Sequence, residues 1–330
     1  MNLYITLDYE LFFAEHSGSV EKSIIEPTKA LIEACEPCMV KLCFFVDAGY
    51  LVRLEKFKSD FPKLQKDYEL ITEQIKYLHK NGHDIQLHIH PHWEDTDYHD
   101  NKWHMDTSRY RIHKFSADET EAIVASYKKA LTDIVGDSVF AYRAGGWCIQ
   151  PFTHLKYALQ KHDIWLDSTL YHDGYKDNST HYLDFRGMPD TTEWHFSDDP
   201  MVIDDDGFFT EVPISSTRVS PLFYIKYALL RKFNKKAHQV MGDGKGVGRE
   251  GSDNREMLTK ITPAVASIDG YRMSYLQKTL NAYAKKDAKH FVVMGHPKAT
   301  TPYSLKKLRE FVIENHSKHN FTTYTQVFNT

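Results

Sequence analysis

The chain of 330 residues has little cysteine and no long hydrophobic run. It contains four cysteines, and Cys35 and Cys38 form a Cys-x-x-Cys pair with no second pair to complete a zinc-binding set. We therefore expect free thiols in a reducing compartment. No stretch approaches the roughly 18 apolar residues that a membrane-spanning helix needs. The N-terminus, MNLYITLDYE, shows no basic segment followed by an apolar one. These absences predict a cytoplasmic protein.

An excess of basic charge is also lacking. Lysine and arginine total 41 against 45 acidic residues, which gives a formal net charge of −4. This balance offers no electrostatic reason to expect nucleic-acid binding. Aromatic residues are abundant, with 20 Tyr and 19 Phe. Such rings can stack on sugars, although we expect most of them to lie in the core.

Strand-like and helix-like segments alternate along the chain. The predicted strands are 2–8, 40–49, 83–89, 139–145, 164–169, 289–297 and a last one at 320–328. Amphipathic helices are predicted between them, and Ser116 with Glu119 forms a capping box at the start of one. This repetition predicts an α/β fold, a distorted (β/α) barrel of about seven parallel strands. We expect a single domain over residues 1–330, with insertions at 93–115 and 171–265.

The second insertion holds three distinctive stretches. Residues 201–216 have the pattern of a hairpin around Asp-Gly. Residues 220–236, SPLFYIKYALLRKFNKK, form an aromatic and basic helix that either lies on a membrane surface or is an ordinary buried helix with solvated cations. The glycine-rich residues 242–256 are expected to form a flexible lid or disordered loop. The alternative is that Lys245 and Arg249 close over a phosphate, but the stretch lacks the P-loop ending.

Chemically capable side chains follow nearly every predicted strand. Active sites of parallel α/β barrels lie at the carboxyl ends of the strands. The residues found there are Asp8, Glu10, Asp47, His88, His90, His92, Arg143, Asp167 and His296. Their shared position predicts one site.

Five motifs resemble the polysaccharide deacetylase family of the NodB-homology type, carbohydrate esterase family 4. They are TLDYE (6–10), GHDIQLHIHPH (82–92), YRAGGW (142–147), WLDST (165–169) and VVMGHP (292–297), in that order. The resemblance covers residues 1–170 and 289–328. It implies a barrel enzyme that uses one divalent metal ion, zinc by type, to hydrolyse the acetyl amide of an amino sugar.

The spacing of the histidines predicts a metal site. His88 and His92 are four apart and can converge on one ion, and hydrolytic zinc sites commonly take three protein ligands. His90 is expected not to be a ligand. In the family, the first Asp of an Asp-Asp pair is the base and the second binds metal, but this chain has Tyr9 at the second position. Glu10 shares a strand face with Asp8 and is the expected third ligand. The reverse assignment, with Asp8 on the metal, stays open.

The resemblance also assigns the catalytic roles. Asp8 is the expected general base and His296 the general acid. Arg143 orients the base, and Asp167 tunes the acid or the arginine. A purely structural ion pair of Arg143 is the alternative, and Asp47 is either a substrate ligand or a plain turn carboxylate.

The predicted function is removal of an N-acetyl group from an amino sugar. Because no leader precedes the first strand, the expected substrate is a nucleotide-linked or lipid-linked precursor in surface-polysaccharide assembly. One alternative is another metal-dependent C–N hydrolase acting on cyclic amides or formamides. The other is a non-catalytic carbohydrate-binding relic, which the Tyr9 departure favours.

Overall fold

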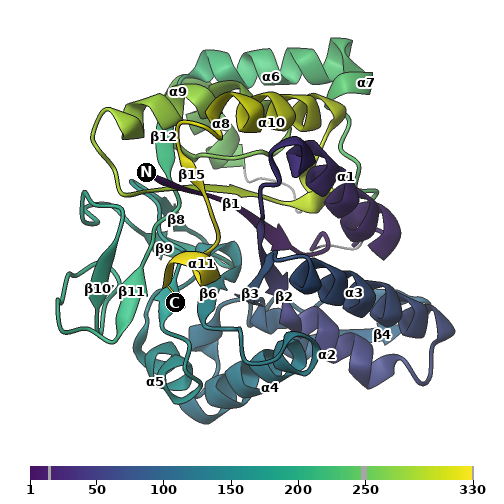
Figure 1. Ribbon diagram of the computed structural model, residues 1–330. Helices are drawn as coiled ribbons and strands as arrows, with labels where there is room; N and C mark the ends of the chain where they lie inside the picture. Colours follow the sequence, from purple (N-terminus) through teal and green to yellow (C-terminus); the bar gives the residue numbers. More distant parts are fainter. Residues whose placement is uncertain (14–15, 247–250, 329–330) are drawn as a thin grey trace.

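The computed structural model describes residues 1–13, 16–246 and 251–328. One curved sheet organises these residues (Figure 1). Its neighbours are parallel except for the β10–β11 pair. In spatial order the strands are β10 (Trp194–Phe196), β11 (Phe209–Glu211), β7 (Leu166–Asp167), β6 (Ala141–Ala144), β3 (Asp84–Ile89), β2 (Cys43–Asp47), β1 (Asn2–Tyr9) and β14 (His290–Gly295). A short strand, β15 (Asn320–Phe321), also pairs with β1.

Helices cover the outside of this sheet, and α6 and α7 form a further layer above α9 and α10 (Figure 1). The helices are α1 (Glu26–Cys35), α2 (Ala48–Phe57), α3 (Pro62–Lys80), α4 (Ala117–Val135), α5 (Thr153–Lys161), α6 (Pro221–Phe233), α7 (Lys235–His238), α8 (Gly251–Thr259), α9 (Met273–Ala284), α10 (Pro302–Asn315) and α11 (Tyr324–Phe328). The short turns are η1 (Glu21–Ile25), η2 (Glu36–Cys38), η3 (Pro91–Asp95), η4 (Ile112–Lys114), η5 (Gly145–Trp147), η6 (Gly270–Arg272) and η7 (Pro297–Ala299). The predicted capping box at Ser116 opens α4.

The alternation of side chains along β1 separates the two faces of the sheet. Leu3, Ile5 and Leu7 pack in the large core beneath the helices. Tyr4 belongs to a second apolar cluster enclosed by the strands. Since successive residues of a strand point to opposite faces, Asp8 continues the inward row that begins at Tyr4. The strand thereby delivers a carboxylate to the carboxyl end of the barrel interior.

The barrel closes irregularly between β11 and β14. Two segments bridge the gap: the Ser215 amide donates to the Val292 carbonyl (3.0 Å), and the Ile268 amide donates to the Met294 carbonyl (3.0 Å). The predicted α/β fold class, a distorted barrel built mainly from parallel strands, is confirmed.

The amino end of the barrel is filled by the C-terminal helix. The predicted strand at 320–328 is wrong beyond Phe321, because the chain turns into α11. Tyr324 enters the interior, stacks on Tyr4 with ring centroids 4.7 Å apart, and hydrogen-bonds to Ser168 (2.8 Å). Burial of this aromatic side chain favours the helix over a longer edge strand.

The predicted insertions contain short elements. Residues 93–115 hold a hairpin of β4 (Asp97–His99) and β5 (Lys102–His104). Residues 171–265 hold β8 (Tyr175–Asp177), β9 (Tyr182–Asp184), β12 (Ser216–Val219) and β13 (Thr262–Val265), besides β10, β11 and α6 to α8. The hairpin expected within 201–216 instead pairs β11 with the earlier β10.

The glycine-rich stretch 242–256 lies partly outside the described residues, which omit 247–250 and therefore Arg249. From Gly251 onward the stretch is helical, as α8, so the loop prediction is wrong there. Within the described ranges, no helix has the length and apolar character that crossing a membrane requires.

Candidate active site and metal centre

Five of the predicted site residues meet at the carboxyl ends of β1, β3, β6 and β14. They are Asp8, Glu10, His88, Arg143 and His296. Glu10 follows β1, His88 and Arg143 are paired residues of adjacent β3 and β6, and His296 follows β14 directly. The convergence follows from strand order, because parallel neighbours end at the same edge of the sheet.

The Glu10 carboxylate lies against two imidazoles. Its Oε2 atom is 3.2 Å from Nε2 of His88 and 2.7 Å from Nε2 of His90. His88 donates its Nδ1 hydrogen to the Arg143 carbonyl (2.9 Å), which leaves Nε2 facing Glu10. Gly145 makes room for the second ring, since a Cβ there would lie 2.5 Å from Nδ1 of His90. One atom from each of these three side chains lies within 4.8 Å of the others.

The structure differs from the sequence prediction at His90 and His92. Residues two apart on an extended chain share a face, so His90 points to the same side as His88. The backbone of His90 is still extended (φ −111°, ψ 94°), and Pro91 then begins η3 and redirects the chain. His92 instead stacks on Tyr110, with ring centroids 5.5 Å apart, and does not contact Glu10. The geometry therefore favours His90 beside His88, whereas His92 as a ligand stays a prediction from spacing.

The donor set suits a divalent cation of the zinc type, which binds imidazole nitrogen and carboxylate oxygen. Burial lowers the pKa of His90 to about 4, so its ring is neutral near pH 7 and has a lone pair for a ligand bond. Burial alone raises the pKa of Glu10, but Lys298, His90 and His88 hold it well below its ordinary value. A second-sphere hydrogen bond, here from His88 to a carbonyl, is typical of metal-binding histidines.

Lys298 is a buried residue of this site that sequence reasoning missed. Its Nζ atom lies 2.7 Å from Oε1 of Glu10 and 2.5 Å from the Leu11 carbonyl. Lys298 follows the predicted acid His296 by two positions, in GHPK. That adjacency was the available signal, although it does not say which carboxylate the lysine meets.

Asp8 is held by a completely buried guanidinium. Arg143 donates from Nη1 to Oδ1 of Asp8 (2.8 Å) and to Oγ1 of Thr6 (2.9 Å), and from Nε to the Ser168 carbonyl (2.7 Å). Its guanidinium carbon lies 4.1 Å from the Phe45 ring centroid. The four contacts fix the orientation of Arg143 and, through it, of the Asp8 carboxylate.

His296 is paired with a carboxylate that the sequence did not single out. Its Nδ1 atom is 2.8 Å from Oδ2 of Asp269, and its backbone amide donates to Oδ1 of Asp269 (2.8 Å). Its Nε2 atom lies 3.8 Å from Asp8 and 3.6 Å from Glu10. Burial lowers the pKa of His296, but the charges of Asp269, Asp8 and Glu10 raise it above the ordinary value. The apolar run before Asp269-Gly270 was the signal for this residue.

Asp167 lies deeper and does not contact His296. Its carboxylate accepts hydrogen bonds from the side chain (2.7 Å) and amide (3.2 Å) of Thr169. It neighbours Glu211, whose pKa is raised well above the ordinary value by burial and by the Asp167 charge. The carboxylate that touches the predicted acid is Asp269, and a tuning role for Asp167 stays a prediction.

Asp47 is a buried carboxylate beside His88 in the β2–β3 register. Its Oδ2 atom accepts from the Trp93 indole (2.6 Å), and Oδ1 has no hydrogen-bond partner in the described residues. Burial raises the pKa of Asp47 to about 7. Asp47 is thus buried at 2% exposure, and both interpretations, a substrate ligand and a plain turn carboxylate, stay predictions.

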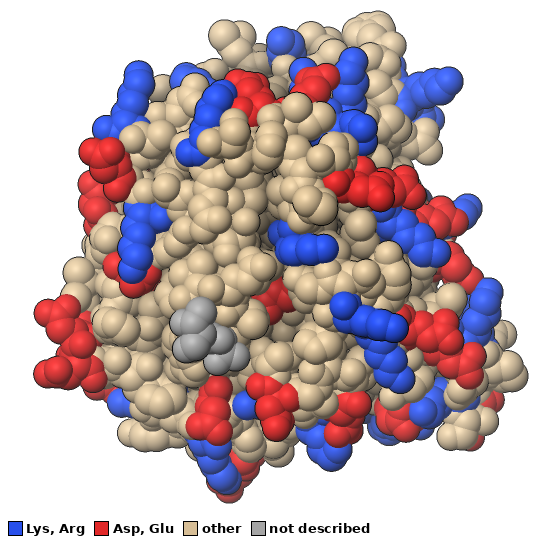
Figure 2. Space-filling model, in the orientation of Figure 1, with Lys and Arg blue, Asp and Glu red and all other residues tan. Residues whose placement is uncertain are grey.

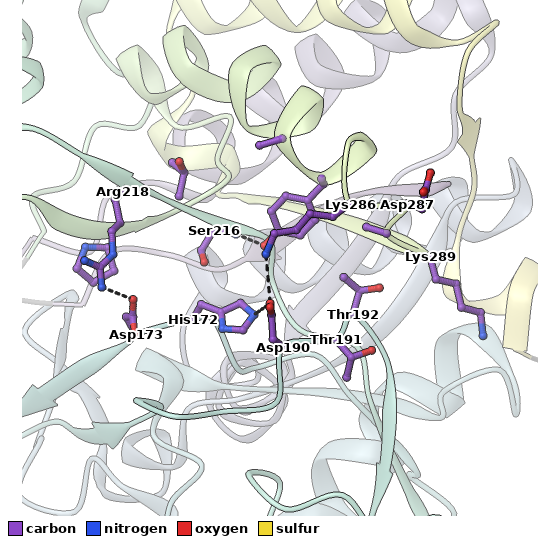
Figure 3. Close-up of a pocket in the computed structure, with 15 residues that line it drawn as sticks. His172, Asp173, Asp190, Thr191, Thr192, Ser216, Arg218, Lys286, Asp287 and Lys289 are labelled. Atoms are coloured by element: carbon purple, nitrogen blue, oxygen red, sulfur yellow. Dashed lines mark hydrogen bonds and ion pairs between the residues drawn. The ribbon is translucent and has the colours of Figure 1, made fainter.

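A cavity of about 580 Å³ lies elsewhere, beside the start of β14 (Figure 3). None of the predicted site residues lines it. Several of its charged groups pair with one another: Asp190 lies 3.4 Å from Lys286, and Arg218 lies 2.6 Å from Asp173 (Figure 3). The clustered carboxylates and imidazoles, not cavity size, identify the candidate site.

No protein-family model and no curated protein matches the sequence significantly. Among solved structures, a protein assigned as a polysaccharide deacetylase from Mycobacterium smegmatis is similar, with a TM-score of 0.54 at 16% identity over 99% of this chain and 88% of that chain. A peptidoglycan N-acetylglucosamine deacetylase is also similar, with a TM-score of 0.43 at 13% identity over 100% of this chain and 88% of that chain. The first likeness shows the fold: the chain has the distorted barrel of polysaccharide deacetylases, and the resemblance carried by its five motifs is confirmed at that level.

Proposed function

We propose that the protein is a metal-dependent hydrolase that removes the acetyl group from the nitrogen of an amino sugar. The observation that carries this proposal is the meeting of three units at one end of the barrel. These units are the Asp8–Arg143 pair, the Glu10–His88–His90 cluster and the Asp269–His296 pair. Together they offer a base, a cation site and an acid within reach of one another, which amide hydrolysis requires.

Asp8 is the proposed general base. Arg143 binds Oδ1 of Asp8 and leaves Oδ2 directed toward His296. In that position Asp8 accepts a proton from the attacking water. The completely buried Arg143 acts through Asp8 and is a positioning residue.

His296 is the proposed general acid. Asp269 accepts the Nδ1 hydrogen and leaves Nε2 directed toward Asp8 and Glu10. The raised pKa favours the imidazolium, which donates its Nε2 proton to the leaving amine. The proposed base and acid thus lie 3.8 Å apart, between Oδ2 of Asp8 and Nε2 of His296.

Glu10, His88 and His90 would hold the metal ion, which in such sites polarises the carbonyl and lowers the pKa of water. The Lys298 ammonium adds a fixed positive charge on Glu10. We further propose zinc as the ion and a nucleotide-linked or lipid-linked amino sugar in a cytoplasmic step of surface-polysaccharide assembly as the substrate.

Elemental analysis tests the metal site. We expect about one divalent ion per chain in the wild type, little in Glu10→Ala and His90→Ala, and retention in His92→Ala. Loss in His92→Ala with retention in His90→Ala would restore the ligand set predicted from the spacing. Absence of metal from the wild type after reconstitution would favour the carbohydrate-binding alternative. In that case the Lys298 ammonium would be the cation that pairs with the Glu10 carboxylate.

Substrate assays test the reaction. We expect acetate release from N-acetylated sugars, and its loss in Asp8→Asn with the metal retained. Ring opening of a cyclic amide or formate release in place of acetate would assign the site to the alternative C–N hydrolase class.

A further inference from the structure

Helix α6 carries an apolar stripe that faces away from the protein. No residue of this helix is buried. At 3.6 residues per turn, four of its apolar positions fall within an arc of about 80°. These outer-stripe residues are Leu222 (73% exposed), Ile225 (43%), Leu229 (50%) and Phe233 (77%).

The opposite face of α6 attaches the helix to the barrel. Phe223 stacks on Tyr271 with centroids 5.4 Å apart, and Tyr227 stacks on the same ring at 5.7 Å. Tyr224 hydrogen-bonds to Thr262 (2.9 Å). The helix is thus held by its aromatic face, and the outer stripe is not part of a core. Exposed Leu258 and Ile261 lie in and after α8, which packs beside α6.

Cations border the outer stripe. On the helical wheel, Lys226 follows one edge and Lys232 the other, each about 20° beyond the last apolar position. From Ser220 to Met241 the chain contains no acidic residue, although the whole protein has a net charge of −4. The basic residues of this segment are Lys226, Arg231, Lys232, Lys235 and Lys236. Figure 2 shows basic side chains, with some acidic ones among them, along the upper edge of the molecule, where α6 and α7 lie in Figure 1.

We propose that α6 and α7 dock on the surface of an anionic lipid bilayer. The outer stripe enters the interface between headgroups and acyl chains, and the flanking lysines meet lipid phosphates while their stems cover apolar surface. A second copy of the chain fits less well, because a symmetric contact would bring together the lysines that border the two stripes, Lys226 and Lys232 of each copy. The stripe also has four residues, whereas a stable protein interface needs roughly 20 on each side.

The docking face is joined to the candidate site by a short segment. After α7, the Met241 amide donates to the Thr300 carbonyl (2.8 Å) and the Gly242 amide to the Lys298 carbonyl (3.2 Å). Lys298 in turn reaches Glu10. A bilayer under α6 would favour a lipid-linked substrate for the site. That consequence rests on the proposed function, whereas the docking does not.

Sedimentation with vesicles tests the docking. We expect the wild-type protein to sediment with vesicles containing phosphatidylglycerol and to stay in solution with phosphatidylcholine alone. The double variant Leu229→Glu/Phe233→Glu should bind these anionic vesicles at least about tenfold more weakly. Each change replaces an apolar side chain that would insert into the bilayer with a carboxylate. Tyr157→Glu is the matched control, since Tyr157 is a 66% exposed aromatic residue on the distant α5.

A charge variant separates the contribution of the lysines to vesicle binding from that of the apolar outer stripe. Lys226→Glu/Lys232→Glu keeps the outer stripe and should lose binding to phosphatidylglycerol, as should the wild type at high salt. Wild-type protein that stays in solution with both vesicle types would overturn the proposal. So would equal binding of the stripe variant, or a dimer that the stripe variant dissociates. Acetate release from a soluble substrate should be unchanged in both variants. If the wild-type protein binds vesicles but releases no acetate from any substrate, the proposed function is wrong and the docking proposal stands.

Discussion

Replacing Arg143 with methionine should destabilise the protein strongly. The side chain has 0% exposure. Its guanidinium donates hydrogen bonds to the Asp8 carboxylate, the Thr6 hydroxyl and two oxygens of Ser168. Methionine fills much of the volume but leaves an uncompensated carboxylate and several unpaired acceptors. Breaking a buried ion pair by removing one partner costs about 3–5 kcal/mol. We expect a loss of that size in the free energy of unfolding, measured by urea denaturation with circular dichroism.

Arg109→Met provides the control. Arg109 makes comparable contacts to Asp95 (2.6 Å) and Glu119 (2.9 Å), but its side chain is 34% exposed. Solvent screens such a pair, so the expected loss is at most about 1 kcal/mol.

The double variant Arg143→Met/Asp8→Asn identifies the cause. It removes the buried charge together with its partner, so it should lose less stability than the sum of the two single variants. A strictly additive result, or an Arg143→Met loss no larger than that of Arg109→Met, would refute the view that Arg143 compensates the Asp8 charge.

Three further outcomes are expected. Asp269→Asn should move the alkaline decline in kcat to lower pH, because Asp269 raises the pKa of His296 and the acid must be protonated; an unchanged pH–rate profile would contradict its role. Lys298→Met should tighten metal binding at least about tenfold in a calorimetric titration, since removing a cation beside Glu10 relieves repulsion of the ion; weaker binding would show that Lys298 mainly positions Glu10. Glu193→Gln should destabilise the protein near neutral pH. Hydrogen bonding by a buried imidazole holds the pKa of Glu193 at about 2, so this stabilisation is present above about 4.5 and lost toward pH 2. A stability difference that persists at pH 2 would show another cause.

Hydrophobic patterning was enough to predict the barrel. Buried parallel strands appear as short apolar runs, and the polar residues that end them must meet at one edge. That reasoning placed Asp8, Glu10, His88, Arg143 and His296 together, and the structure brings them together. The period-2 alternation of a strand also placed the two carboxylates on one side of Tyr9.

The sequence alone could not determine contacts that depend on where the chain turns. The turn at Pro91 carries His92 away from Glu10 and leaves His90 beside it. Asp269 reaches His296 from a segment that bridges the barrel without forming one of its long strands.

Helix α6 shows the same limit. Its sequence is apolar on two sides, and the periodicity that predicts a helix does not say which side meets the protein. Packing of Phe223 and Tyr227 on Tyr271 decides this and leaves the outer stripe facing outward. Local pattern thus determined the elements and the row of strand-end residues, because these depend on neighbours in the chain. Long-range packing decided the partners, because those depend on residues that lie from tens to hundreds of positions away in the chain.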